Sequence, residues 1–379
     1  MDAPWLISGA AATICAIALA LILRRLSRYP GMAIVKSILP VLGGLYGASL
    51  ASIMLMRVEY SNLVLVSGFM GTLIARYALS TLRIRAPEMI FWTVPGGRID
   101  IVYELPKIAV LPLQEPALPK GPNFAIIADL HAHHSPEWER LLAEAAISGR
   151  PVYHHKQVWE AGTGKVQIDH LSENSFGALV PSLTYQKLKR LVDLVFCVMV
   201  FPCAALLMLV TAILIKLDGS GPVFFLQRRM GFRGDLFHVI KFRTMAVISD
   251  GEHREASITE AGDQRITRIG HFLRRTRLDE LPQIFNIVLG EMSWIGPRPE
   301  AVSLSSWYET EIPFYRYRHI VRPGITGWAQ VNQGHVASLE EVDDKLQYDF
   351  FYIKNLSYWL DILIVFRTIR VVMSGFGAK

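Results

Sequence analysis

Two adjacent carboxylates, Asp279 and Glu280 in the segment LDELPQ, are the residues of this sequence best suited to chemistry. Arginines precede them at positions 274, 275 and 277. Successive side chains on a helix point about 100° apart, so the two carboxylates are expected to have different roles. One can act as a nucleophile on phosphorus while the other holds a divalent metal that neutralises phosphate charge. Taken alone, the pair would be explained as the acidic start of a helix, which the macrodipole favours.

Three arginine-bearing segments accompany the pair. The segment WIGPRPE places Arg298 between two prolines, and RPGITGWAQVN (322–332) is a second rigid turn that carries Arg322 and the amide of Gln330. The block from Gln227 to Met245 offers several cations around two glycines, as a loop that binds phosphates would. Singly, each segment could be a structural turn. Together they indicate a polyanionic substrate such as a pyrophosphate.

The composition places part of the chain in lipid. Of its 379 residues, 51% are hydrophobic and 19% are charged, whereas soluble domains are about a quarter charged. Apolar runs at roughly 5–23, 33–56 and 63–79 are each near the twenty residues that a membrane span requires, so residues 1–85 are predicted to form three transmembrane helices. Arginines after the first and third runs place those ends in the cytoplasm.

A fourth apolar run, Leu194 to Ile215, is interrupted by Pro202, which removes a helical hydrogen bond. Basic residues flank it on both sides, as expected for a segment that enters and leaves the membrane on the cytoplasmic face. The sequence therefore predicts a re-entrant helix at about 189–216, broken near Pro202. The alternative is a simple fourth span that exports the C-terminal half.

Residues 86–181 are predicted to form a small α/β module. Within it, a strand from Phe124, a helix over 135–148 and a strand ending at Tyr153 form one βαβ unit without a dinucleotide-binding glycine motif. Histidines fall at both strand ends, and their interpretation as solvated loop residues is preferred over a metal site. They are His131, His133, His134, His154 and His155. The cysteines at 15, 197 and 203 lie in apolar runs and are expected to be buried thiols of a reducing compartment.

The ordered motifs from Tyr185 to Gly375 resemble the bacterial sugar transferase family, the monotopic phosphoglycosyl transferases. They are KRLVD (189–193), the proline-interrupted helix, KFRTM, LDELPQ, GPRP, RPGITGWAQVN and YDFFYIKNLS (348–357). The expected fold is an α/β membrane protein of the family's long form. It has N-terminal transmembrane helices, the small α/β middle module, and a mostly helical catalytic domain over 182–379 with a re-entrant membrane helix.

The resemblance implies a polyprenyl-phosphate hexose-1-phosphate transferase that acts in two steps with Mg²⁺ as cofactor. Asp279 would attack the β-phosphorus of a UDP-hexose and expel UMP, and undecaprenyl phosphate would then take the phosphosugar from Asp279. Glu280 would be the Mg²⁺ ligand. The residues implied to bind substrate phosphates are Arg298, Arg243, Lys241, Arg322 and Gln330.

The resemblance also implies a location and partners. The protein would lie in the bacterial inner membrane with its catalytic domain facing the cytoplasm, starting exopolysaccharide, capsule or O-antigen synthesis. A homodimer is expected and a nucleic-acid partner is not. The amphipathic segment from Tyr358 to Met373 would add an interfacial membrane contact, or else be an ordinary core helix. Two alternative functions remain: a lipid glycosyltransferase that moves only the sugar, and a membrane scaffold that binds a UDP-sugar without catalysis.

Overall fold

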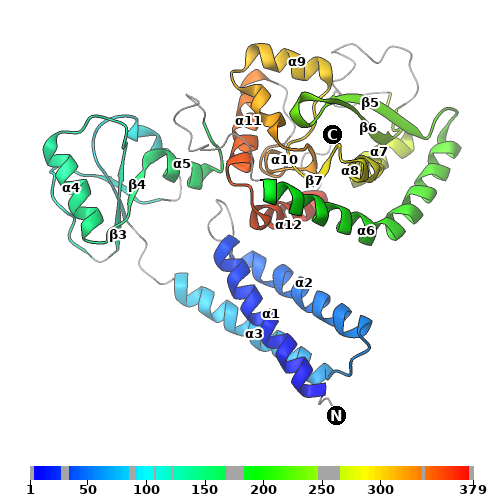
Figure 1. Cartoon of the computed structure of the whole chain (residues 1–379), viewed down its shortest axis with the longest axis horizontal. Coiled ribbons are helices and arrows are strands. Elements are labelled where there is room, and N and C mark those ends of the chain that lie inside the picture. Colours follow the sequence, from blue (N-terminus) through cyan, green and yellow to red (C-terminus); the bar gives the residue numbers. More distant parts are fainter. Residues whose placement is uncertain are drawn as a thin grey trace. The chain divides into compact units, whose positions relative to one another are not determined.

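The computed structural model describes residues 4–26, 34–84, 90–105, 108–121, 123–167, 183–245, 265–334 and 338–374 (Figure 1). The chain divides into two compact units, Met1–Gly164 and Lys165–Lys379. The boundary expected at 181/182 between the middle module and the catalytic domain lies outside the described residues.

Three apolar helices open the first unit: α1 (Pro4–Leu26), α2 (Ile34–Leu55) and α3 (Asn62–Ile84). Each is long and apolar enough to cross a membrane, and 23 residues of helix rise about 34 Å. The three helices pack against one another, and α1 and α3 approach so closely at Gly68 that a Cβ there would lie 2.7 Å from the Cβ of Ala12. Many of their other apolar side chains are exposed, as lipid contact requires.

The middle module is a four-stranded parallel sheet in the order β2-β1-β3-β4. Its strands are β1 (Ile90–Thr93), β2 (Val110–Pro112), β3 (Phe124–Ala128) and β4 (Val152–His154). The predicted βαβ unit is confirmed: α4 (Pro136–Ile147) joins β3 to β4, with Ser135 at its N-cap and Gly149 at φ +75° after its end. A one-turn helix, η1 (Ile99–Val102), and α5 (His155–Thr163) complete the module.

The interpretation of the module's histidines as solvated loop residues is wrong for His154 and His155, which are only 9% and 1% exposed. The physical reason is that β4 runs directly into α5, which packs against the sheet, so no loop separates them. Burial lowers the pKa of both rings, that of His154 to about 4, so both are neutral at pH 7. His131 and His133 are exposed, as expected.

The second unit begins with α6 (Leu183–Asp218), a helix of 36 residues that contains Pro202. The expected break is not there: α6 is one continuous helix that bends along its length (Figure 1). A proline inside a helix removes one hydrogen bond and kinks the axis without ending the helix when the turns on either side continue. The expectation that all three cysteines are buried fails at Cys203, which is exposed beside Pro202.

The block from Gln227 to Met245 is mostly an antiparallel hairpin, not the expected phosphate-binding loop. Its strands are β5 (Phe224–Met230) and β6 (Leu236–Phe242). The two glycines, Gly231 and Gly234, lie in the tight turn between the strands, which contains η2 (Phe232–Gly234). Because these residues pair as two strands, Arg228, Arg229 and Lys241 are placed on a sheet and not on a loop.

Short helices and a second strand pair complete the unit. In chain order they are α7 (Arg268–Thr276), η4 (Leu278–Glu280), α8 (Gln283–Leu289), β7 (Ser293–Ile295), α9 (Val302–Glu311), η5 (Tyr315–Ile320), β8 (Gly324–Thr326), α10 (Trp328–Asn332), α11 (Leu339–Lys354) and α12 (Tyr358–Ser374). Helix α12 coincides with the predicted amphipathic segment. It packs Leu360, Leu363 and Ile364 into the core, yet Val365 and Ile369 are exposed, so it has both a core face and an apolar outer face.

Candidate active site

The carboxylate pair lies in a tight turn between two helices. Helix α7 ends at Thr276, and Arg277, its C-cap at φ 59°, reverses the chain into the single turn η4, which carries Asp279 and Glu280. Pro282 is the N-cap of α8. Glu280 is 6% exposed, whereas Asp279 is only partly buried. The turn thus puts the two neighbouring carboxylates in different surroundings.

Two cations bind Glu280. Nη2 of Arg298 donates to its Oε1 at 2.7 Å, and Nζ of Lys241 lies 3.5 Å from the same oxygen. Burial alone would raise the pKa of Glu280, but these two positive charges outweigh it and hold the pKa well below its usual range. Burial in turn lowers the pKa of Lys241 to about 8. Glu280 is therefore ionised and fixed in place.

Asp279 has no comparable partner. Among the described residues its carboxylate makes no hydrogen bond or ion pair. Burial, and then the negative charge of Glu280, raise the pKa of Asp279 to about 6, although Lys241 and Arg298 act in the opposite direction. One carboxylate of the pair is thus held by cations and the other is left open.

Lys241 is positioned by a buried amide. Nδ2 of Asn286, on α8, donates to the carbonyl of His238 at 2.7 Å, and the N–H of Ile240 donates back to Oδ1 of Asn286 at 3.0 Å. These bonds join α8 to strand β6 immediately before Lys241. The strand therefore presents Lys241 to the turn that precedes α8.

Two further arginines hold the loop that carries Arg298. Nη2 of Arg318 donates to the carbonyl of Arg298 at 3.0 Å, and Nη1 of Arg229 donates to the carbonyl of Pro299 at 3.0 Å. Arg318 is itself buried and pairs with Asp349 of α11 at 2.7 Å. Glu300 on the same loop pairs with Lys345 of α11. The loop is thereby fixed to β5, η5 and α11.

Three glycines bring the GPRP loop and the RPGITG strand together backbone to backbone. The strands β7 and β8 pair in parallel at these segments. A Cβ on Gly324 would lie 2.1 Å from the nitrogen of Gly296, and a Cβ on Gly327 would lie 2.2 Å from the carbonyl oxygen of Gly296. No side chain fits there. The glycines of these two motifs therefore allow the two backbone segments to lie in direct contact next to Arg298.

Three residues expected to bind phosphate are not brought to the carboxylate pair. Arg243 donates to the carbonyls of Ser220 and Gly219 at 2.6 and 2.8 Å, at the C-terminus of α6. Nε of Arg322 donates to the carbonyl of Gly290 at 2.9 Å. Nε2 of Gln330 donates to the carbonyl of Ile325 at 3.1 Å. All three bind main-chain carbonyls of their own unit.

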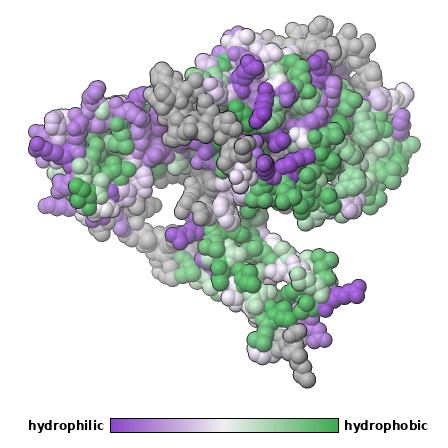
Figure 2. Space-filling view, viewed as in Figure 1, coloured by the Kyte–Doolittle hydropathy of each residue, from purple (hydrophilic) through white to green (hydrophobic). Residues whose placement is uncertain are grey.

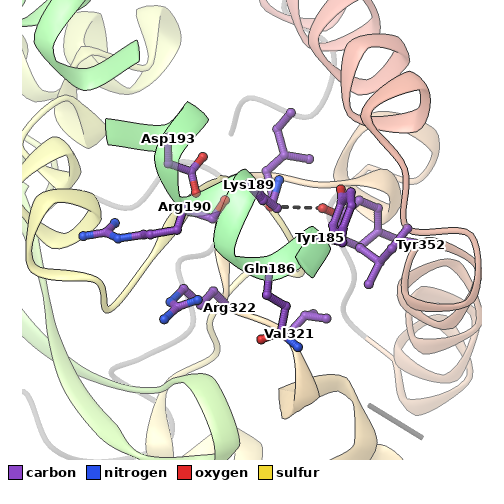
Figure 3. A pocket seen from close by; sticks show the side chains of 11 residues that line it. Tyr185, Gln186, Lys189, Arg190, Asp193, Val321, Arg322 and Tyr352 are labelled. Atoms are coloured by element: carbon purple, nitrogen blue, oxygen red, sulfur yellow. Dashed lines mark hydrogen bonds between the residues drawn. The ribbon is translucent and has the colours of Figure 1, made fainter. Parts of the chain in front are cut away.

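Arg322 instead faces a small cavity at the beginning of α6 (Figure 3). Lys189, Arg190 and Asp193 of the KRLVD motif line the same cavity. Nζ of Lys189 pairs with Asp361 of α12 at 2.7 Å, and the guanidinium of Arg190 binds carbonyls at the end of α8. The KRLVD motif therefore joins the first turns of α6 to α8 and α12 of the same unit.

Arg229, Arg318 and Asp349 are part of the site but are not predicted as site residues from their local sequence. A signal existed for Asp349, because a carboxylate within the apolar run YDFFYI must be exposed or paired. Nothing in the local pattern identified Arg318 as its partner, which lies 31 residues away along the chain.

The carboxylate pair fits the demands of Mg²⁺. This ion prefers oxygen ligands and is usually held by one or two carboxylates together with substrate phosphates and water. Glu280 is ionised and oriented, and beside it lies the carboxylate of Asp279, which forms no ion pair with any residue in the described part of the chain. A site with so few protein ligands suits an ion that arrives with a phosphate-bearing substrate.

Comparison with known proteins is consistent with this geometry. The sequence profile of a family described as bacterial sugar transferase matches residues 184–375. A UDP-N-acetylgalactosamine-undecaprenyl-phosphate N-acetylgalactosaminephosphotransferase of Aeromonas hydrophila is 42% identical over 362 residues, which cover 95% of this chain and 85% of that protein. The chain belongs to the bacterial sugar transferase family.

Other relatives of this sugar transferase match only about half of the chain. A UDP-glucose:undecaprenyl-phosphate glucose-1-phosphate transferase of Xanthomonas campestris pv. campestris is 49% identical over 169 residues, 44% of this chain and 35% of that protein. An Escherichia coli (strain K12) protein of the same name is 42% identical over 196 residues, 51% of this chain and 41% of that protein. The match to these two relatives thus leaves out most of their own length.

The glycine contact yields a testable prediction. Gly324→Ala places a methyl group 2.1 Å from the backbone nitrogen of Gly296, so the GPRP loop must move. We expect the free energy of unfolding to fall by about 1–3 kcal/mol and the transferase rate to fall with it. Thermal unfolding in detergent and sugar-phosphate transfer measure the two effects. Gly219→Ala is the matched control, since nothing lies within 4 Å of a Cβ there; equal loss in both variants would contradict the explanation.

Proposed function

We propose that this sugar transferase moves a hexose 1-phosphate from a UDP-sugar to undecaprenyl phosphate and releases UMP. The reaction would be the first membrane step of exopolysaccharide, capsule or O-antigen synthesis, at the cytoplasmic face of the inner membrane. The printed names of the relatives describe transfers of this kind. The observation that carries the proposal is the asymmetry of the carboxylate pair: Glu280 is bound by two cations, whereas Asp279 has no ion pair with any described residue.

In the first step an oxygen of Asp279 attacks the β-phosphorus of the UDP-sugar. The bond from that phosphorus to the bridging oxygen breaks, UMP leaves with the electron pair, and the phosphosugar becomes an acyl phosphate on Asp279. Arg298 and Lys241, positioned around Glu280, lie where they can share positive charge with the phosphates. Mg²⁺, held by Glu280, would neutralise phosphate charge when bound.

In the second step a phosphate oxygen of undecaprenyl phosphate attacks the same phosphorus. The bond to Asp279 breaks, the carboxylate is regenerated, and the sugar leaves on a lipid-linked diphosphate. The lipid must meet Asp279 at the membrane surface. Exposed apolar side chains on β5 and α6, including Phe225, Leu226 and Leu206, give the catalytic unit a surface suited to lipid contact, and Figure 2 shows this green surface.

The packing of α6 supports a re-entrant arrangement of this helix. Its first turns are tied to the catalytic unit by Lys189 and by Asp193, whose Oδ1 accepts from the N–H of Trp294. Its last turns pack Met208 and Ile215 against the core of the same unit. A straight helix of 36 residues would be about 54 Å long, far beyond the 30 Å hydrocarbon layer. These contacts and this length support the proposal that both ends of the bent helix lie on one side of the membrane.

N-acetylgalactosamine is the first sugar to test. The Aeromonas hydrophila relative, which matches 95% of the chain, is named for this sugar, whereas the two glucose-1-phosphate transferases match about half of the chain. The carboxylate site itself contacts phosphates in this mechanism, so it does not discriminate between hexoses.

The nucleophile is tested with Asp279→Asn. The purified wild-type protein, given UDP-N-acetylgalactosamine and Mg²⁺ alone, should release UMP and gain the mass of one phosphosugar. Asp279→Asn should form no adduct and should lower transfer by roughly 10³-fold or more. Asp235→Asn, an exposed carboxylate on the hairpin turn, is the control. When undecaprenyl phosphate is then added as acceptor, release of UDP would favour a transferase that moves only the sugar, and no release of nucleotide would favour a scaffold. Full transfer by Asp279→Asn would contradict the nucleophile.

The raised pKa of Asp279 predicts a pH dependence. A protonated carboxyl cannot attack phosphorus, so kcat/KM for UMP release should fall about tenfold per pH unit below about pH 6. Lys241 lowers the pKa of Asp279, so Lys241→Gln should move this acidic limb to higher pH. Measurement without undecaprenyl phosphate excludes titration of the lipid phosphate. A rate that stays constant down to pH 4.5 in folded protein would argue against an unpaired, desolvated nucleophile.

The arrangement of α6 is tested with single cysteines in a cysteine-free background. Lys187→Cys and Asp218→Cys, before and after the apolar part of α6, should both react with an impermeant maleimide from the cytoplasmic side only. Glu59→Cys, between α2 and α3, should react from the opposite side and is the control. Labelling of positions 187 and 218 from opposite sides would show that α6 spans the membrane.

A further inference from the structure

A second polar cluster lies in the middle module, at the carboxyl ends of its parallel strands. Asp129 directly follows β3, His154 ends β4, and His155 begins α5. In the strand order β2-β1-β3-β4, β1 and β3 are the two central neighbours. The sheet extends from β1 to β2 on one side and from β3 to β4 on the other, so the chain connections leave β1 and β3 in opposite directions. In open α/β sheets, ligands bind outside the carboxyl ends of the strands at such a point.

The three side chains converge on one oxygen. Nε2 of His154 and Nδ1 of His155 each lie 3.6 Å from Oδ1 of Asp129, and the three potential ligand atoms are within 4.8 Å of one another. All three residues are buried. Two ligand atoms on a tetrahedral Zn²⁺ are about 3.3 Å apart, given bonds near 2.0 Å. The two distances to Oδ1 of Asp129 exceed that spacing by about 0.3 Å, and ligand atoms up to 4.8 Å apart would move closer together around the ion.

His155 is the decisive residue. Its side chain is 2% exposed, yet neither ring nitrogen has a hydrogen-bond partner among the described residues. Buried polar side chains in folded proteins nearly always have a partner. Nδ1 of His155 faces Oδ1 of Asp129 at 3.6 Å, beyond hydrogen-bond distance but close to the spacing of two ligands on one ion. Within the described residues, therefore, no partner for this ring is supplied.

We propose that Asp129, His154 and His155 bind one divalent transition metal ion of the Zn²⁺ class. Two imidazoles and a carboxylate are ligands that such ions favour over Mg²⁺. Nδ1 of His131 lies 2.9 Å from Nε2 of His154, so this ring can supply a fourth ligand. His131 is exposed, which gives the ion a path into the cluster.

The surroundings orient the carboxylate. The N–H of Arg98 donates to Oδ2 of Asp129 at 3.0 Å, and the N–H of His131 donates to Oδ1 at 3.1 Å. Gly97, at φ +65°, brings the backbone so close that a Cβ would lie 2.2 Å from Oδ2. Carboxylates that bind metals are commonly hydrogen-bonded in this way by a surrounding shell.

Metal binding requires a change of tautomer at His154. Nδ1 of His154 accepts from the N–H of Lys156 at 3.1 Å, so in the metal-free ring Nε2 carries the proton and donates to His131. Coordination through Nε2 moves that proton to Nδ1 and releases the Lys156 N–H, with no net change in protons on the ring. The beginning of α5 should therefore respond to the ion.

The test uses the full chain in detergent, purified without a histidine tag and with excess Mg²⁺ to occupy oxygen-rich sites. Titration with Co²⁺ should give one ion per chain and visible absorption typical of low coordination number. His155→Ala should raise the dissociation constant for Co²⁺ by about 100-fold or more, and Asp129→Asn should do the same. His133→Ala, an exposed residue of the same loop, should leave it unchanged.

Two outcomes would overturn the proposal: a wild-type chain that binds no Co²⁺ at micromolar concentration, or a His155→Ala chain that binds it as tightly as wild type. The wild-type spectrum decides the matter even if His155→Ala fails to fold. Hydrogen exchange provides a further readout, since Co²⁺ should change the exchange rate of the amide at the beginning of α5. UMP release is not used, so this test is independent of the proposed function.

Discussion

Burying the negative charge of Glu280 beside a second carboxylate requires nearby positive charge. Much of the packing in the second unit, Lys165–Lys379, serves to hold the residues that supply this charge. Arg298 and Lys241 supply it. The loop that carries Arg298 is held in place by Arg318, which donates to the carbonyl of Arg298. Arg318 is compensated by Asp349 on α11. Because removing one member of such a series leaves an uncompensated buried charge, the catalytic turn, the GPRP loop and α11 are held as one assembly.

The same unit holds its membrane helix by polar contacts at both ends. At the beginning of α6, Asp361 accepts from Lys189 and from the hydroxyl groups of Tyr185 and Tyr352. At the end of α6, Arg243 binds carbonyl groups that the helix leaves unpaired. The apolar residues between these ends are largely exposed. Polar termini on the protein and an apolar middle suit a segment that enters lipid without crossing it.

Regular sequence patterns predict the membrane helices and part of the middle module. Long apolar runs identified the membrane helices, and the βαβ unit of the middle module was read from its cap, glycine and strand composition. The pairing of Arg298 and Lys241 with Glu280 depends on chain folding over dozens of residues, which no local spacing encodes. Arg243 and Arg322 were assigned to phosphate because arginine suits both anions and main-chain carbonyls, and sequence alone does not distinguish the two. His155 was misjudged because a strand runs into a helix without a loop.

The bend of α6 bears on where the enzyme can work. A spanning helix must match the thickness of its bilayer, at a cost that grows with each ångström of mismatch. On the proposed arrangement α6 enters and leaves by one leaflet, so the depth of the catalytic turn is set by that leaflet's surface and not by the opposite one. Changes in acyl-chain length would then act on α1, α2 and α3, while the carboxylates keep their height above the lipid phosphates.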